Sequence, residues 1–189
     1  MKKFAALVLF LLSALVFAAC SNDDSTGSEP DGKAAHNAAD VTFATGMIPH
    51  HEQAVEMADI ALATTQNPQI TELAQQIKDA QQPEIDTLAE WLKAWGEPMP
   101  DASTMGEHSG HGMSGMMSAE DMAMLGKTSG TEFDQMWLQM MIEHHEGAVE
   151  MAQTQQADGK YPEAGEMSEQ IIASQQEEID QMKELLSGL

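Results

Sequence analysis

The stretch MIPHHEQAVEMA, residues 47–58, returns almost unchanged as MIEHHEGAVEMA, residues 141–152. The offset that takes Met47 to Met141 also aligns QQPEID at residues 81–86 with QQEEID at residues 175–180, without any insertion. The chain therefore contains a duplicated unit of about 55 residues, which runs from Asp40 to Trp95 and again from Asp134 to Leu189.

Each unit is predicted to be a hairpin of two helices, because its apolar residues recur at helical spacing and Pro and Gly interrupt it once. The expected helices begin near Asp40, at Gln69, somewhat before Asp134 and at Glu163, and end at Asn67-Pro68, Trp95, residues 158–162 and Leu186. Pro83 predicts a kink that the second copy, with Glu177 there, lacks. An apolar stripe on each helix can be buried only by assembly, so we expect an all-α four-helix bundle of two tandem helical hairpins over residues 40–189.

Histidine interrupts the apolar face of the first helix in each unit. At about 100° per residue, the second His of each pair shares a line with the core residues, so His51 and His145 are predicted to point inward. The first of each pair, His50 or His144, is predicted to lie at a seam. The second helices carry Gln81 and Glu84, and their copies Gln175 and Glu178, on the apolar face.

A carboxylate or amide buried in mid-helix without a partner costs several kcal/mol. The side chains available as partners at that depth are His51 and His145. We therefore expect a polar layer of His, Glu and Gln inside the bundle, flanked by Met thioethers.

Three interpretations of this layer are open. The side chains can simply satisfy one another and fix the helix register. They can bind a metal: imidazole suits Zn, Cu, Fe and Ni, thioether favours Cu(I), and Cu(II) accepts imidazole and carboxylate. They can also form a ferritin-type di-iron or di-manganese oxidase, but Glu-x-x-His is absent, since the residues three before the four histidines are Met47, Ile48, Met141 and Ile142. The candidate metal ligands are His50, His51, His144, His145, Met47, Met57, Met140, Met141, Met151, Glu84 and Glu178.

The connection between the hairpins, residues 99–124, holds seven Met and two His amid Gly and Ser. We interpret it as too rich in Gly and Ser to fold as core, so packing does not explain its Met content. A thioether binds Cu(I) or Ag(I) almost independently of pH, which favours metal capture over an incidental linker composition. The candidate connector ligands are Met105, His108, His111, Met113, Met116 and Met117.

The N-terminal segment is typical of a secreted bacterial lipoprotein. Lys2 and Lys3 precede an apolar run, Phe4 to Ala19, that is too short for a transmembrane helix and ends in VFAAC. We predict a signal peptide at residues 1–19 and lipid attachment at Cys20; a plain signal peptide or an uncleaved anchor is the alternative. Residues 20–39 are small, polar and acidic and are predicted to form a flexible tether, in which His36 is solvated.

Charge and motif content exclude several function classes. With 31 acidic against 8 basic side chains and a net charge of −23, the chain would repel nucleic acid. No nucleophile triad, phosphate-binding loop or zinc-type Cys cluster occurs, so hydrolase and nucleotide chemistry are not expected.

The paired MIxHHExAVEMA segments, each followed by a helix bearing QQxEID, resemble domain-of-unknown-function family three-hundred-and-five. This resemblance covers about Asp40 to Leu189 and implies a ferritin-like four-helix fold outside the cytoplasm, with copper binding attested for some members. Met47, His50, His51 and Met57, with their copies Met141, His144, His145 and Met151, match its motif.

The function expected from the sequence is that of a lipoprotein, anchored through Cys20 to a bacterial membrane at its periplasmic face or cell surface. It would buffer or sequester Cu(I) or Cu(II), or another transition metal, in copper tolerance or delivery. An oxidase or ferroxidase using a metal in the bundle, and a metal-free interaction scaffold with a protein partner, are the alternatives.

Overall fold

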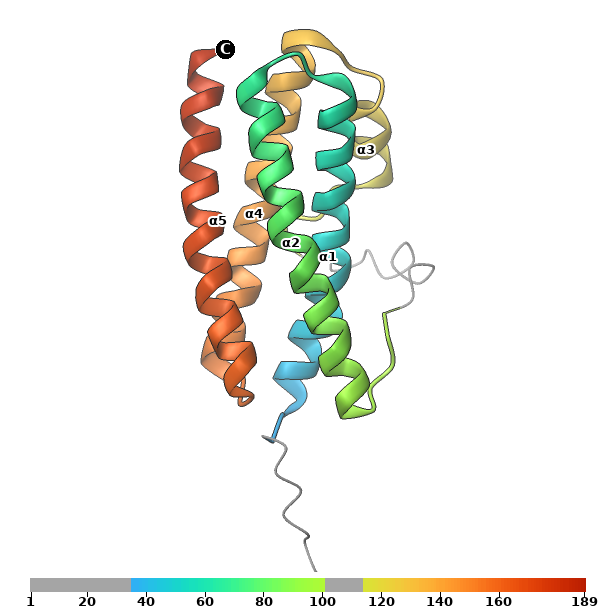
Figure 1. Cartoon of the computed structure of the whole chain (residues 1–189), viewed down its shortest axis with the longest axis vertical. Helices are drawn as coiled ribbons and strands as arrows, with labels where there is room; N and C mark the ends of the chain where they lie inside the picture. The colour runs from blue at the N-terminus through green and yellow to red at the C-terminus, as the bar shows by residue number, and fades with distance from the viewer. Residues whose placement is uncertain (1–34, 101–113) are drawn as a thin grey trace, which may run out of the picture. The chain divides into compact units, whose positions relative to one another are not determined.

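A computed structural model describes residues 35–100 and 114–189 of the chain, and these residues form helices and no strand (Figure 1). The helices are α1 (Ala38–Thr64), α2 (Pro68–Trp95), α3 (Ala119–Leu125), α4 (Gly130–Asp158) and α5 (Pro162–Gly188). The four long helices confirm the predicted pair of helical hairpins. The predicted signal peptide, Cys20 and most of the tether lie outside the described residues. Within the described ranges, no helix is long and apolar enough to span a membrane.

The helix ends follow from capping residues. Asn37 begins α1: its side chain accepts hydrogen bonds from the backbone N–H groups of Ala39 and Asp40, so the helix starts two residues before Asp40. Asn67 caps α2 in the same way, with Pro68 at the first helical position. Helix α1 contains Pro49 and helix α2 contains Pro83, and neither helix ends at its proline. Pro83, where a kink is predicted, therefore lies inside one continuous helix.

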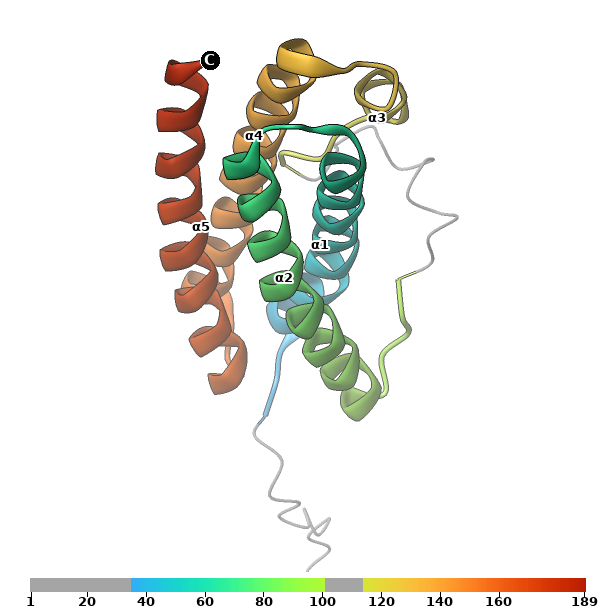
Figure 2. The same cartoon turned by 45° about the horizontal axis from the view of Figure 1, so that its top comes forward.

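The two hairpins meet through their first helices. Helix α1 packs against α2, α4 packs against α5, and α1 packs against α4 across the repeat. The short helix α3 contacts α4 and lies away from α5 in both views (Figures 1 and 2). The His-His pairs stand on α1 and α4, so the packing between repeats brings the two copies of the motif together.

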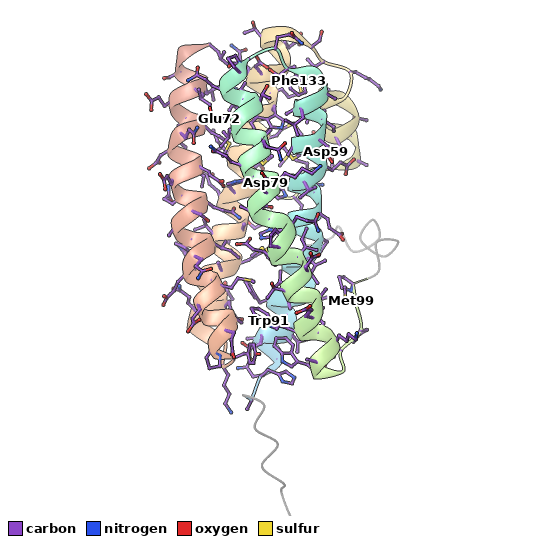
Figure 3. The ribbon with its side chains drawn as sticks, in the orientation of Figure 1. Asp59, Glu72, Asp79, Trp91, Met99 and Phe133 are labelled. Atoms are coloured by element: carbon purple, nitrogen blue, oxygen red, sulfur yellow. The ribbon has the colours of Figure 1, made fainter. Side chains whose placement is uncertain are left out.

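The core consists of two apolar clusters stacked along the bundle. The first holds the later half of α1 and the first half of α4, and includes Phe133; the second holds the opposite halves, with Trp91 packed at its edge (Figure 3). On all four long helices, polar residues lie between the clusters: His50 and His51, Gln81 and Glu84, His144 and His145, Gln175 and Glu178. The predicted polar layer therefore exists and crosses the bundle between its two cores.

Buried carboxylates hold the ends of the bundle together. Asp40, fully buried, accepts hydrogen bonds from the Gln155 side chain and from the backbone N–H groups of Lys160 and Tyr161, which lie in the loop of the other hairpin just before α5. Burial acts to raise the pKa of Asp40, but these hydrogen bonds and that from Asn37 outweigh it and lower the pKa. At the matching position of the second repeat, Asp134 accepts a hydrogen bond from the Thr65 hydroxyl, 2.6 Å away. Each first helix is thus tied to the loop of the opposite hairpin.

Two predictions about flexible segments are wrong at their edges. The ring of His36 stacks on Trp95, with ring centroids 4.5 Å apart, so the tether ends before this residue. The connector folds over its last part, because Ser118 caps α3, Leu125 is fully buried and Met117 is only 9% exposed. Met117 thus packs in the first core cluster, although the connector was predicted to be too rich in Gly and Ser to fold as core. Met105, His108, His111 and Met113 lie outside the described residues.

Candidate metal centre

All four histidines of the repeated motif are fully buried. The helical wheel correctly predicts this for His51 and His145, which lie on the core line. His50 and His144 lie at the seam between α1 and α4, and their full burial was not predicted, because it arises from these two helices packing against each other. Helical periodicity describes one helix at a time and carries no information on which flank a neighbouring helix covers.

His51 and His145 each pair with a glutamate of their own hairpin. The Nε2 atom of His51 lies 2.7 Å from Oε2 of Glu84, and Nε2 of His145 lies 2.8 Å from Oε2 of Glu178. These are the partners predicted for the two carboxylates, and we call them the outer pairs. A carboxylate only accepts, so each imidazole donates from Nε2, and its Nδ1 has no partner among the residues that the structure describes. The glutamate side chains remain 21% and 17% exposed, which gives the outer pairs contact with solvent.

His50 and His144, which we call the inner pair, lie face to face across the junction of the repeats. Their ring centroids are 3.8 Å apart and the ring planes are inclined by 43°. Nε2 of His50 donates to the backbone carbonyl of Ser114 at 3.1 Å, while Nδ1 of His50 and both ring nitrogens of His144 have no partner in the described part of the chain.

The inner pair is neutral because charging it inside the core is unfavourable. Burial, together with the neighbouring His51, lowers the pKa of His50 to about 3. Burial and the other histidines hold the pKa of His144 well below its usual value. A neutral imidazole with an unshared lone pair is the form that binds a metal ion.

The glutamines of the layer are buried but not bonded to histidine. Gln81 and Gln175 are each 2% exposed. Neither the nitrogen nor the oxygen of the Gln81 amide, nor the oxygen of the Gln175 amide, has a partner among the described residues. The expected partnership with histidine therefore holds for the carboxylates and fails for the amides.

The candidate thioethers lie on both sides of the layer. Met57, Met141 and Met117 belong to the first core cluster, whereas Met47 belongs to the second, with Met151 packed against it. Met47, Met57 and Met141 are fully buried; Met116, Met140 and Met151 are half-buried.

The donors present fit a soft metal better than a hard one. Among the residues that the structure describes, no three His, Cys, Asp or Glu side chains form a group that could hold one ion. A di-iron centre needs such groups, whereas imidazole with thioether is a donor set for Cu(I). The unpartnered nitrogens of the inner pair supply the imidazole, and the surrounding Met residues are the remaining source of donors.

A short segment of the connector, Ser114–Met117, covers the inner pair, and we call it the strap. The Gln53 side chain donates to the Met117 carbonyl at 2.9 Å and accepts from the Met117 N–H at 2.7 Å. The Ser114 hydroxyl donates to Glu150 at 2.6 Å. A side chain at Gly147 would collide with the Ser114 carbonyl and lie 2.8 Å from the Gly115 nitrogen, so the strap needs glycine there.

The strap was not predicted from the sequence, although one difference between the two repeats points to it. The two copies of the motif differ at a single position between the histidines and their shared AVEMA: HHEQ in the first and HHEG in the second. Gln53 and Gly147 occupy that position, and both contact the strap.

Comparison with known proteins identifies relatives over most of the chain. The family described as Domain of unknown function (DUF305) matches residues 40–186. A presumed secreted DUF305 protein from Streptomyces coelicolor is 32% identical, covers 79% of this chain and 93% of its own, and has a TM-score of 0.72. A DUF305 fragment from Deinococcus radiodurans is 28% identical, covers 83% and 99%, and has a TM-score of 0.73. The comparison with curated proteins gives no match.

A third relative was solved with metal. CopM in its Cu(II)-bound form is 35% identical, covers 79% of this chain and 96% of its own, and has a TM-score of 0.69. Structures of CopM in Cu(I)-bound and Ag-bound forms also match.

Proposed function

We propose that this chain, which belongs to the DUF305 family, binds copper in its polar layer and buffers or sequesters the metal outside the cytoplasm. The observation that carries the proposal is the inner pair: two neutral, fully buried imidazoles that face each other, with three ring nitrogens that have no partner in the described part of the chain. Leaving buried polar atoms unpartnered costs about 1–3 kcal/mol each, so the layer is not optimised for stability alone. A metal ion bound to Nδ1 of His50 and to the unprotonated nitrogen of His144 would satisfy two of these atoms.

The donors divide into two kinds of environment. Met57 and Met141 lie in the core cluster on one side of the layer that holds the inner pair, and imidazole combined with thioether favours Cu(I). The outer pairs combine imidazole with carboxylate, which Cu(II) accepts. Met47, Met140 and Met151 are the further thioethers proposed as ligands. Bound copper would supply a one-electron redox couple, while the protein supplies the donors and excludes water from the inner pair.

The relatives support the choice of metal. CopM was solved with Cu(I), Cu(II) and Ag, and its similarity to this chain covers both copies of the His-His motif. The acidic surface, to which exposed Asp59, Glu72 and Asp79 contribute (Figure 3), raises the local concentration of cations at low salt.

Copper titration of the purified protein, under reducing conditions for Cu(I) and in air for Cu(II), tests the proposal. We expect saturable binding that is lost in the His50/His51/His144/His145→Ala variant. His36→Ala is the matched control, because this histidine lies outside the layer and stacks on Trp95. Equal binding by the protein and the fourfold variant would contradict a site in the layer.

The anchor is proposed from the N-terminal sequence, with Cys20 as the lipidated residue. Partition of the protein between detergent and aqueous phases, after expression in a bacterial host that processes lipoproteins, tests it. We expect the protein in the detergent phase and Cys20→Ser in the aqueous phase, with a mass difference that equals the lipid. An unmodified protein in the aqueous phase would leave a secreted soluble form.

A further inference from the structure

The strap is the one non-helical segment of the described chain that contacts a histidine of the polar layer. Ser114 is exposed to solvent, and its carbonyl accepts the hydrogen bond from Nε2 of His50, which is fully buried. Within the described chain, the residue bonded to this nitrogen is therefore itself in contact with solvent. The rings of the inner pair meet between α1 and α4, which pack against each other.

The contacts that hold the strap are few and polar. They are the two hydrogen bonds between Gln53 and the Met117 backbone, the bond from the Ser114 hydroxyl to Glu150, and the bond from His50 to the Ser114 carbonyl. Only Met117 anchors the segment in the core. Gly115, with φ of +79°, adopts a backbone conformation suited to glycine and lies against the carbonyls of α4.

We propose that the strap is a removable cover of the inner pair, and that Gln53 and Gly147 are positioning residues that set how readily it opens to a soft cation such as Cu(I) or Ag(I). The inference rests on the proposed copper function. While the strap is docked, the Ser114 carbonyl holds the proton of His50 Nε2 and blocks the path from solvent. When it withdraws, His50 becomes accessible, and the two repeats present equivalent imidazoles.

The asymmetry of the repeats supports this reading. If the repeated motif only fixed the register of the helices, the same residue would be expected after HHE in both copies. That residue is Gln53 in α1 and Gly147 in α4. Gln53 is long enough to hold the Met117 backbone, whereas Gly147 makes room for Ser114 and Gly115 on the facing helix. Each residue serves one side of the same docked segment.

The test uses the full chain, with Ag(I) as a redox-inert probe, and two readouts: stopped-flow association of Ag(I) and hydrogen exchange at the Met117 amide. That amide donates to Gln53 and should be protected without metal. On Ag(I) loading we expect its protection to fall while the amides of α1 and α4 stay protected. In Gln53→Ala, loss of two hydrogen bonds should raise both Met117 exchange and Ag(I) association about tenfold.

Gly147→Ala should have the same effect, and its helix gains from alanine, so the variant is expected to fold. Gly165→Ala on α5, where an added side chain meets nothing within 4 Å, is the matched control and should leave both readouts unchanged. The cover is refuted if Ag(I) binds while Met117 stays protected, or if faster exchange in the variants leaves the association rate unchanged. If the protein takes up no Ag(I) or Cu(I) at all, the proposed function fails first.

Discussion

The two copies of the His-His-Glu motif are almost identical in sequence, yet their histidines have different surroundings. The outer pairs repeat closely, at 2.7 Å for His51 and Glu84 and 2.8 Å for His145 and Glu178. The inner pair does not repeat: His50 is capped by the Ser114 carbonyl, whereas His144 has no partner for either nitrogen in the described residues. Duplication explains the likeness, and the connector, which occurs once, explains the difference. The part of the layer that departs from symmetry is therefore the part to which we assign Cu(I) binding.

Replacing the inner pair should have the largest effect, because only this pair differs between the two repeats. In His50→Leu/His144→Leu we expect Cu(I) affinity to fall at least about a thousandfold, or about 4 kcal/mol, because both imidazole ligands are lost. The metal-free variant should be as stable as the parent or more so, since apolar side chains replace unpartnered polar ones. Competition titration and thermal unfolding measure the two effects. A variant that loses stability and keeps its affinity would make the pair structural.

Lowering the pH should reduce the stability of the folded protein through the inner pair. The pKa of His50 is about 3 in the folded chain against about 6.5 unfolded, so below pH 6.5 the unfolded state binds the extra proton. Stability should be unaffected above pH 7 and fall toward pH 3, with about 2 kcal/mol lost to His50 alone by pH 5. His144 acts in the same direction.

Urea unfolding of the metal-free protein at several pH values measures this loss. The double leucine variant is the control and should have a flatter pH profile over the same range. A profile as steep as that of the parent would assign the acid sensitivity to other groups.

The two outer pairs have nearly the same geometry, so equivalent substitutions in them should have equal effects on stability. Glu84→Ala and Glu178→Ala each leave a buried imidazole without its acceptor, and each should cost about 1–2 kcal/mol of unfolding free energy, reduced by the partial exposure of the carboxylates. Chemical denaturation at neutral pH measures both. Losses that differ by more than about 1 kcal/mol would show that the repeats are unequal in this part of the layer as well.

The smallest effects are expected at the surface, where each hairpin carries one ion pair. Lys78 contacts Asp59 and Lys183 contacts Glu146, with all four side chains at least 35% exposed. Replacing either lysine with glutamine should change the unfolding free energy by less than about 0.5 kcal/mol. A larger change in one hairpin would place part of the asymmetry outside the polar layer.

Most of the fold could be predicted from the sequence, since periodicity and caps act locally. The outer pairs could be predicted as well, because Glu84 stands on an apolar stripe and His51 is at the same depth. The burial of His50 and His144 could not, because it depends on the packing of α1 against α4. The strap could not be predicted either: the side chain of Gln53 bonds to the backbone of Met117, 64 residues away, and a contact of this kind produces no periodic pattern in the sequence.

X-ray absorption at the copper edge of the Cu(I)-loaded protein tests the central claim most directly, because it reports the donor atoms themselves. We predict sulfur scatterers together with imidazole nitrogens, and loss of the imidazole contribution in His50→Leu/His144→Leu. A copper environment of oxygen and nitrogen alone, or one unchanged by that substitution, would contradict a thioether and imidazole site at the junction of the repeats.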